Sequence, residues 1–144
     1  MKIRDILRTK GHDVVTTPPD ETVLAAMRVL VQHNIGSIVV VEGSEIRGIL
    51  TERDVLRLGA KDPAKLGTMK VGDVMTTNLV IGVLDDDLEY VMGVMSRNRI
   101  RHLPVLEDDR LVGILSIGDV VNTCRKNAET ENRYLKDYIQ GMVR

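Results

Sequence analysis

Two copies of a polar pair, a hydroxyl followed three residues later by a carboxylate, carry the chemistry that this sequence offers. Thr51 precedes Asp54, and Ser116 precedes Asp119, in each case directly after Gly-Ile-Leu. A carboxylate can accept hydrogen bonds from both vicinal hydroxyls of a ribose, and a Ser or Thr hydroxyl can donate to a phosphate oxygen. The two pairs therefore suggest two related nucleotide-binding sites.

The same spacing fits a capping box, in which the hydroxyl and the acid satisfy free backbone N–H groups at a helix start. Because such boxes are common, the spacing alone favours a purely structural role. Two features favour a ligand site instead. Each pair follows a predicted buried strand, where ligands of α/β proteins gather, and a helix N-terminus offers N–H donors to phosphate. Both interpretations stay open at this point.

The chain is a tandem duplication with an offset of about 65 residues. Residues 20–57 align with residues 85–122 without a gap. Residues 2–7 resemble residues 70–75 at a slightly larger offset, so the first copy carries a short insertion, which we place at residues 10–13. Lys10, in this insertion, could reach a phosphate.

Each copy reads as strand, helix, strand, strand, helix. Continuous apolar runs at residues 38–41 and 103–106 are typical of strands buried on both faces. The pattern predicts an α/β (α+β) fold: two small three-stranded sheets with helices on one face, related by pseudo-two-fold symmetry. We expect short first strands at residues 14–16 and 79–81, helix N-caps at Asp20 and Asp85, and a linker at residues 59–69. We expect the first repeat over residues 1–66, the second over residues 67–126 and a C-terminal helix over residues 127–144.

The first long helix of each copy has more apolar surface than one sheet can cover. Its predicted buried face holds Val23, Met27, Leu30 and Val31 in the first copy and Leu88, Val91, Met92 and Met95 in the second. Other apolar residues widen both faces, and a helix that is apolar around most of its girth requires burial on two sides. We expect a homodimer across this surface, although the two copies also cover each other in part.

The bulk composition excludes several classes of protein. The 144 residues carry a net charge of −1 and no basic tract, which argues against a nucleic-acid partner. No segment approaches the roughly 20 apolar residues that span a bilayer. The single cysteine, Cys124, cannot form an internal disulfide, which favours a reducing cytoplasm. His12, His33 and Cys124 show no metal-ligand spacing, so we expect no metal.

With these features together, the chain resembles a tandem pair of cystathionine-β-synthase-type (CBS) domains, the Bateman module. The resemblance covers roughly residues 1–125. It depends on the doubled Gly-x-x-[Ser/Thr]-x-x-Asp pattern, on the Arg-His-Leu-Pro-Val run at residues 101–105, and on the repeat length. It implies a stand-alone regulatory module that binds AMP, ADP, ATP or NAD between the two copies and acts through a partner protein or a dimer. The alternative is a ligand-free scaffold in which both pairs only cap helices.

The resemblance also implies roles for individual residues. Asp119 and Ser116 resemble the ribose-binding acid and the phosphate-side hydroxyl of one cleft, and Asp54 and Thr51 fill the same places in the other. In the family, each cleft borrows the first strand of the opposite copy to read the adenine edge. This implies Val14 and Val15 for the Asp119 cleft, and Val80 and Ile81 for the Asp54 cleft.

A basic group completes the implied sites. Arg101 and His102 precede the strand that contains Pro104, where the family keeps phosphate-facing groups, and the first copy lacks this run. Arg53 offers a guanidinium suited to bidentate phosphate contact. No Ser/His/Asp set or Cys-His pair is recognisable, so we expect a binding protein and not an enzyme.

Overall fold

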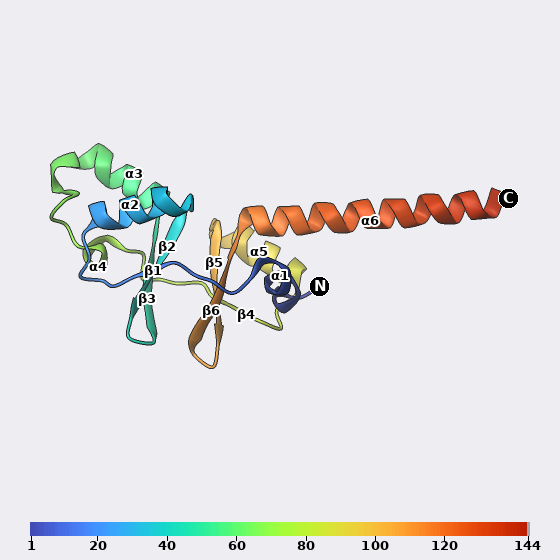
Figure 1. Cartoon of the computed structure of the whole chain (residues 1–144), viewed down its shortest axis with the longest axis horizontal. Coiled ribbons are helices and arrows are strands. Elements are labelled where there is room, and N and C mark those ends of the chain that lie inside the picture. Colours follow the sequence, from blue (N-terminus) through green and yellow to red (C-terminus); the bar gives the residue numbers. More distant parts are fainter. Residues whose placement is uncertain (144) are drawn as a thin grey trace.

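The computed structural model describes the backbone of residues 1–143 and the side chains of residues 1–133 and Lys136. Two sheets lie side by side, each with its own helices (Figure 1). The elements of the first half are α1 (Ile3–Lys10), β1 (Thr16–Thr17), α2 (Val23–His33), β2 (Ser37–Glu42), β3 (Glu45–Thr51), α3 (Glu52–Lys61) and the 3-10 turn η1 (Pro63–Lys65). Those of the second half are α4 (Val71–Val74), β4 (Gly82–Val83), α5 (Leu88–Asn98), β5 (His102–Glu107), β6 (Arg110–Ser116) and α6 (Ile117–Val143).

The two sheets have the same topology, which confirms the predicted α/β repeat. Their strand orders are β1-β2-β3 and β4-β5-β6, with a parallel pair followed by an antiparallel hairpin in each. The central strands β2 and β5 include the predicted apolar runs, of which residues 38–40 and 103–105 are buried. Val39 pairs with Ile49 in one sheet and Pro104 with Ile114 in the other, at equivalent positions.

Several predicted boundaries are wrong. The first strands begin two to three residues later than expected, at Thr16 and Gly82, because only there does the chain reach the parallel register with the central strand. The predicted linker is partly helical, since α3 continues to Lys61. Residues 3–10 and 71–74, to which the sequence pattern assigned no structure, form helices.

The predicted N-caps Asp20 and Asp85 are also wrong. Thr22 is the N-cap of α2, and its hydroxyl accepts a hydrogen bond from the backbone N–H of Ala25. Asp87 is the N-cap of α5. Asp85 instead forms an ion pair with Arg4 at 2.8 Å, which joins the start of α1 to the second repeat.

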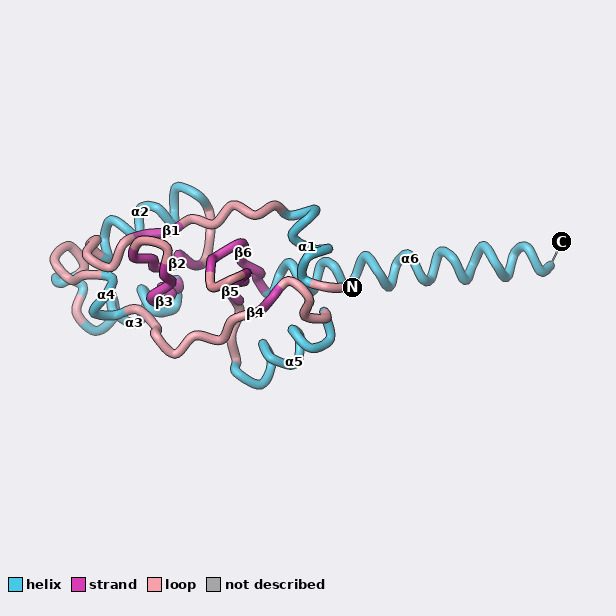
Figure 2. Tube along the Cα trace, turned by 90° about the horizontal axis from the view of Figure 1, so that it is seen from below, coloured by secondary structure: helices cyan, strands magenta, loops and turns pink. Residues whose placement is uncertain are grey.

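The two halves exchange their short first helices. Helix α1 packs into the second repeat, where Ile3 and Leu7 are completely buried in the core under α5, β5 and β6. Helix α4 packs into the first repeat, where Val71 is completely buried. Both views show α1 on the side of the second sheet and α4 on the side of the first sheet (Figures 1 and 2). Each hydrophobic core therefore needs a helix that precedes the other repeat in the sequence.

Part of the predicted apolar helix face is exposed in this single chain. Val23, Leu30, Leu88, Val91 and Met95 are buried as expected, whereas Val31 is 82% exposed and Met92 is 42% exposed. Leu56 on α3 and Val121 on α6 are also exposed, at 74% and 58%. These four residues, Val31, Leu56, Met92 and Val121, are called the apolar helix surface below.

Helix α6 begins at the second polar pair and extends away from the body of the molecule (Figure 1). It runs from Ile117 without a break, so the expected C-terminal helix over residues 127–144 is the outer part of one longer helix, with Arg144 outside the described residues. The predicted apolar face of that segment includes Tyr134, Leu135, Tyr138 and Ile139, whose side chains lie outside the described part. No described helix is both long and apolar enough to cross a membrane.

Candidate nucleotide site

Both polar pairs form complete capping boxes at the ends of β3 and β6. The Thr51 hydroxyl accepts from Asp54 N–H at 3.2 Å, and Asp54 Oδ2 accepts from Thr51 N–H at 3.0 Å. In the second repeat Ser116 Oγ accepts from Asp119 N–H at 3.1 Å, and Asp119 Oδ2 accepts from Ser116 N–H at 2.8 Å. The structural role is therefore real in both copies.

Capping occupies only one oxygen of each carboxylate. Among the described residues no protein group donates a hydrogen bond to Oδ1 of Asp54 or of Asp119. Both acids are half-buried, so their free oxygens lie at the surface of the protein and not in its core. An acid of this kind can cap its helix and also accept a ligand hydroxyl.

Lys10 distinguishes the Asp119 side from the Asp54 side. Its Nζ donates to Asp119 Oδ2 at 2.5 Å and to the carbonyl of Ile114 at 2.6 Å. The side chains of this pair are 32% and 25% exposed. Burial by itself raises the pKa of Asp119, but the hydrogen bonds from Lys10 and Ser116 outweigh it and hold that pKa below its usual value. No described cationic side chain lies within ion-pair distance of Asp54.

A cavity of about 300 Å³ adjoins the Lys10–Asp119 pair, between α1 and the start of α6. Polar side chains including Asn122, Thr123 and Lys126 line it. A cavity of this size and polarity offers room beside the carboxylate for a polar ligand group.

His102 lies between the two repeats. A methyl group placed on Gly36 would be 3.3 Å from His102 Nε2 and 3.3 Å from Glu52 Oε1, so the imidazole packs against Gly36 and Glu52 of the first repeat. Burial is the main reason that the pKa of His102 lies below its usual value. Lys10 and Arg101 lower the pKa of His102 further, whereas the carboxylates of Glu52 and Asp119 raise it. Glycine at position 36 keeps this junction open.

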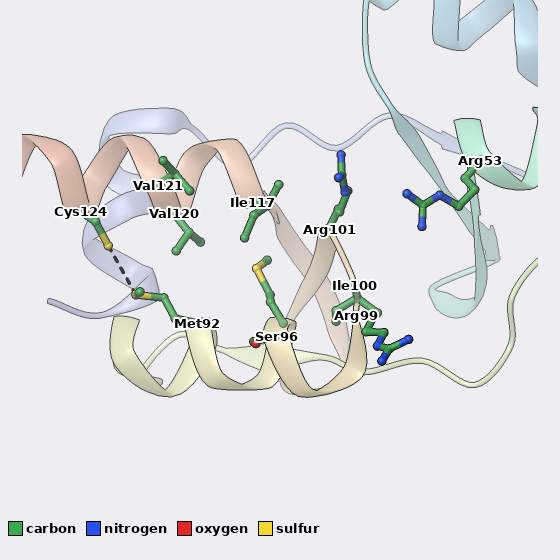
Figure 3. A pocket seen from close by; sticks show the side chains of 11 residues that line it. Arg53, Met92, Ser96, Arg99, Ile100, Arg101, Ile117, Val120, Val121 and Cys124 are labelled. Carbon is green, nitrogen blue, oxygen red and sulfur yellow. Dashed lines mark hydrogen bonds between the residues drawn. The ribbon is translucent and has the colours of Figure 1, made fainter.

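Three arginines line a second cavity, of about 500 Å³, between α5 and α6 (Figure 3). Arg53 comes from the first turn of α3, whereas Arg99 and Arg101 come from the segment between α5 and β5. None of the three forms an ion pair with a described carboxylate. The rest of the lining is mainly apolar and includes Met92, Ile117 and Val121.

The structure brings together some of the candidate site residues and leaves others apart. Arg53 and Arg101 share the arginine-lined cavity, and Lys10, His102 and Asp119 lie close enough for their charges to interact. Arg99 was missed; it is the left-handed C-cap of α5, and its only sequence signal is its position two residues before Arg101. Pro104 is buried in the central strand β5.

The residues expected to read the adenine edge do not lie in regular strands. Val14 and Val15 lie in the loop before β1, and the carbonyl of Val15 accepts from Val39 N–H. Val80 packs against the second core, and Ile81 is 41% exposed. Their role toward a base stays a prediction, as do the ligand roles of the other candidate residues.

Comparison with known proteins decides the family. The model of the CBS domain matches twice, over residues 3–61 and 71–126. The chain belongs to the CBS-domain family. The two matches place one CBS domain on each of the repeats and confirm the resemblance drawn from the doubled motif.

Relatives and solved structures agree with this assignment. The chain is 36% identical over 148 residues to the mitochondrial CBS domain-containing protein CBSX3 of Arabidopsis thaliana, covering 96% of this chain and 72% of that protein. The crystal structure of the CBS-domain containing protein ATU1752 from Agrobacterium tumefaciens matches with a TM-score of 0.82 and 39% identity, covering 85% of this chain and 98% of that one.

A third CBS protein was solved with ligands. The CBS domain pair of protein MJ0100, in complex with 5′-methylthioadenosine and S-adenosyl-L-methionine, matches with a TM-score of 0.76 and 25% identity, covering 85% of this chain and 98% of that one. CBS domain pairs of this architecture thus include one that binds adenosine-containing molecules.

Proposed function

We propose that this CBS domain pair is a regulatory module that binds an adenine nucleotide of the AMP, ADP, ATP or NAD type. The observation that supports it most strongly is the state of the two acids. Asp54 and Asp119 each cap a helix with one oxygen and leave the other without a protein donor. A ribose hydroxyl is a natural donor to such an oxygen. The arginines at positions 53, 99 and 101 supply positive charge that no described carboxylate neutralises. This charge is available to bind a phosphate group.

Binding at these positions would be communicated to a partner. Arg53 belongs to the first repeat, and Arg101 to the second, so a phosphate held by both would tie the repeats together. The arginine-lined cavity also reaches Met92 and Val121 of the apolar helix surface, across which we propose a homodimer. A ligand changes the dimer or a partner complex only if it binds one arrangement more tightly than the other.

The test is thermal unfolding with AMP, ADP, ATP, NAD and S-adenosylmethionine at millimolar concentration. A ligand at one hundred times its Kd adds about 2.7 kcal/mol to the free energy of unfolding. Asp119→Asn keeps an oxygen that can cap the helix but loses the charge that favours ribose hydroxyls. We expect this variant to be less stable than the wild type without ligand, because Lys10 loses its counter-charge. Measured from its own ligand-free melting temperature, it should lose most of the ligand-induced increase.

Asp86→Asn is the matched control. Asp86 also accepts a backbone hydrogen bond, from Val83 N–H at 2.9 Å, but lines neither of the two cavities described above. It should retain the full ligand response. An unchanged melting temperature with every adenosine compound would refute the proposal.

The complete capping boxes favour a second candidate, a ligand-free scaffold in which both pairs are structural only. In that case Ser116→Ala would lower stability by about 1 kcal/mol, the usual value of an N-cap interaction, and would change no binding. Mass spectrometry of small molecules released on denaturing the purified protein separates the candidates, because a scaffold releases no nucleotide.

A further inference from the structure

We propose that Lys10 makes the Asp119 cleft selective for adenosine ligands that carry a phosphate, whereas the Asp54 cleft has no such requirement. This inference depends on the proposed nucleotide-binding function and assigns different ligand preferences to its two sites. It comes from an asymmetry between the repeats at one pair of equivalent positions.

The outer edges of β3 and β6 are covered in different ways. In the first repeat Ile49 exchanges two backbone hydrogen bonds with Thr76, at 3.0 and 2.9 Å. The equivalent residue of the second repeat is Ile114, whose carbonyl accepts from Lys10 Nζ. Two residues earlier, the carbonyl of Val112 lies 2.9 Å from His12 Nδ1. Lys10 and His12, at the site of the insertion, therefore contact the edge of β6 where a backbone bridge covers the edge of β3.

The insertion places a positive charge on only one of the two acids. Asp119 Oδ2 receives both the Ser116 N–H and the Lys10 ammonium, whereas Asp54 Oδ2 receives only the Thr51 N–H. Because Lys10 and Asp119 are half-buried, the ammonium is poorly hydrated and depends on this carboxylate. A ribose that places one hydroxyl on the free Oδ1 and its vicinal hydroxyl on Oδ2 competes with the ammonium for Oδ2.

The charges around Lys10 make this displacement unfavourable for a neutral ligand. The positive charges of Lys10 and Arg101 both lower the pKa of His102, so both side chains lie near the imidazole. A neutral nucleoside would leave the ammonium with the Ile114 carbonyl as its partner but without a counter-charge. A phosphorylated nucleoside brings its own anion, and the flexible four-carbon stem of lysine allows Nζ to turn from the carboxylate to a phosphate oxygen.

The experiment isolates the Asp119 cleft with Asp54→Ala and measures AMP and adenosine binding by titration calorimetry. Because Ala removes a helix cap, Asp54→Asn serves as a second background if the first is unstable. In the isolated cleft, adenosine should bind far more weakly than AMP. Adding Lys10→Met, which keeps the apolar stem, should strengthen adenosine binding about fivefold and weaken AMP binding by a similar factor, as expected for one half-buried ion pair. Lys126→Met, which removes a lysine from the same cavity, should leave the ratio unchanged.

Each other result overturns the inference. If Lys10→Met weakens AMP and adenosine equally, Lys10 is a simple contact for both ligands. If it changes neither, or if Lys126→Met has the same effect, the ion pair does not set selectivity. In these cases AMP still binds and the proposed function stands. If no adenosine compound binds to the wild-type chain or to any variant, the proposed function fails together with the inference.

Discussion

The exchange of first helices predicts that Leu7 in α1 is as important to stability as any residue of the sheets. Leu7 is completely buried, and a methyl group on Gly113 would lie 2.7 Å from its Cδ1, so the leucine packs directly on the β6 backbone. Leu7→Ala removes three carbon groups, worth about 2.4 kcal/mol in transfer free energy. Gly113 has no side chain that can move into the space, so a cavity cost is added. We expect a loss of about 3 kcal/mol.

Urea unfolding followed by circular dichroism measures this loss, which corresponds to a decrease in Tm of about 10 °C for a chain of this length. Arg8→Ala is the control, because the neighbouring Arg8 side chain is 73% exposed, and its effect should be within about 0.5 kcal/mol. The double variant Leu7→Ala, Gly113→Ala should be more stable than the sum of the two single changes predicts, since the new methyl group occupies the vacated space.

A small effect of Leu7→Ala, below about 1 kcal/mol, would refute the packing of α1 into the second repeat, because few completely buried leucines can be truncated at so low a cost. Additive single changes would refute the specific contact between Leu7 and Gly113 while leaving the position of the helix intact.

Three further predictions concern other parts of the molecule. Leu56→Glu, which places a charge on the apolar helix surface, should convert the expected dimer to a monomer in sedimentation experiments, whereas a monomeric wild-type chain would contradict the dimer. Burial lowers the pKa of His102 in the folded chain, so as the pH falls the imidazole of the unfolded chain is protonated before that of the folded chain. The stability of the wild type should therefore decrease below about pH 6.5, and His102→Gln should remove that part of the decrease. Gly48→Ala should destabilise the chain by about 1 to 3 kcal/mol, because the added carbon would lie 2.7 Å from the Thr76 carbonyl; an unchanged urea midpoint would show that this contact relaxes freely.

The features that the sequence predicted are those with a local physical signal. The central strands were predictable because a short apolar run followed by a polar turn is typical of a strand buried on both faces. The Thr51 and Ser116 caps were predictable because a capping box joins residues three apart. The N-cap of α2 was not, since Asp20, Glu21 and Thr22 are consecutive polar residues. Which of them caps depends on where the backbone turns into the helix.

The features that were missed involve contacts between distant parts of the chain. Lys10 and Asp119 are 109 residues apart, and no local pattern relates them. The similarity between residues 2–7 and 70–75 identified a repeated segment but did not reveal which sheet it covers. Arg99 and Arg53 line the same cavity only because the two repeats pack against each other. Duplication therefore predicts equivalent elements, while the differences between the two sites arise from tertiary contacts.

Helix α6 gives the second polar pair a mechanical connection to the far end of the molecule. Its first turn contains Asp119, and its 27 residues form one continuous rod about 40 Å long. A rod of this length amplifies small rotations, because a tilt of about 5° at its base moves its tip by about 3 Å. A movement of the Asp119 carboxylate that tilts α6 would thus displace the far end of this helix, where another molecule can contact it (Figure 1).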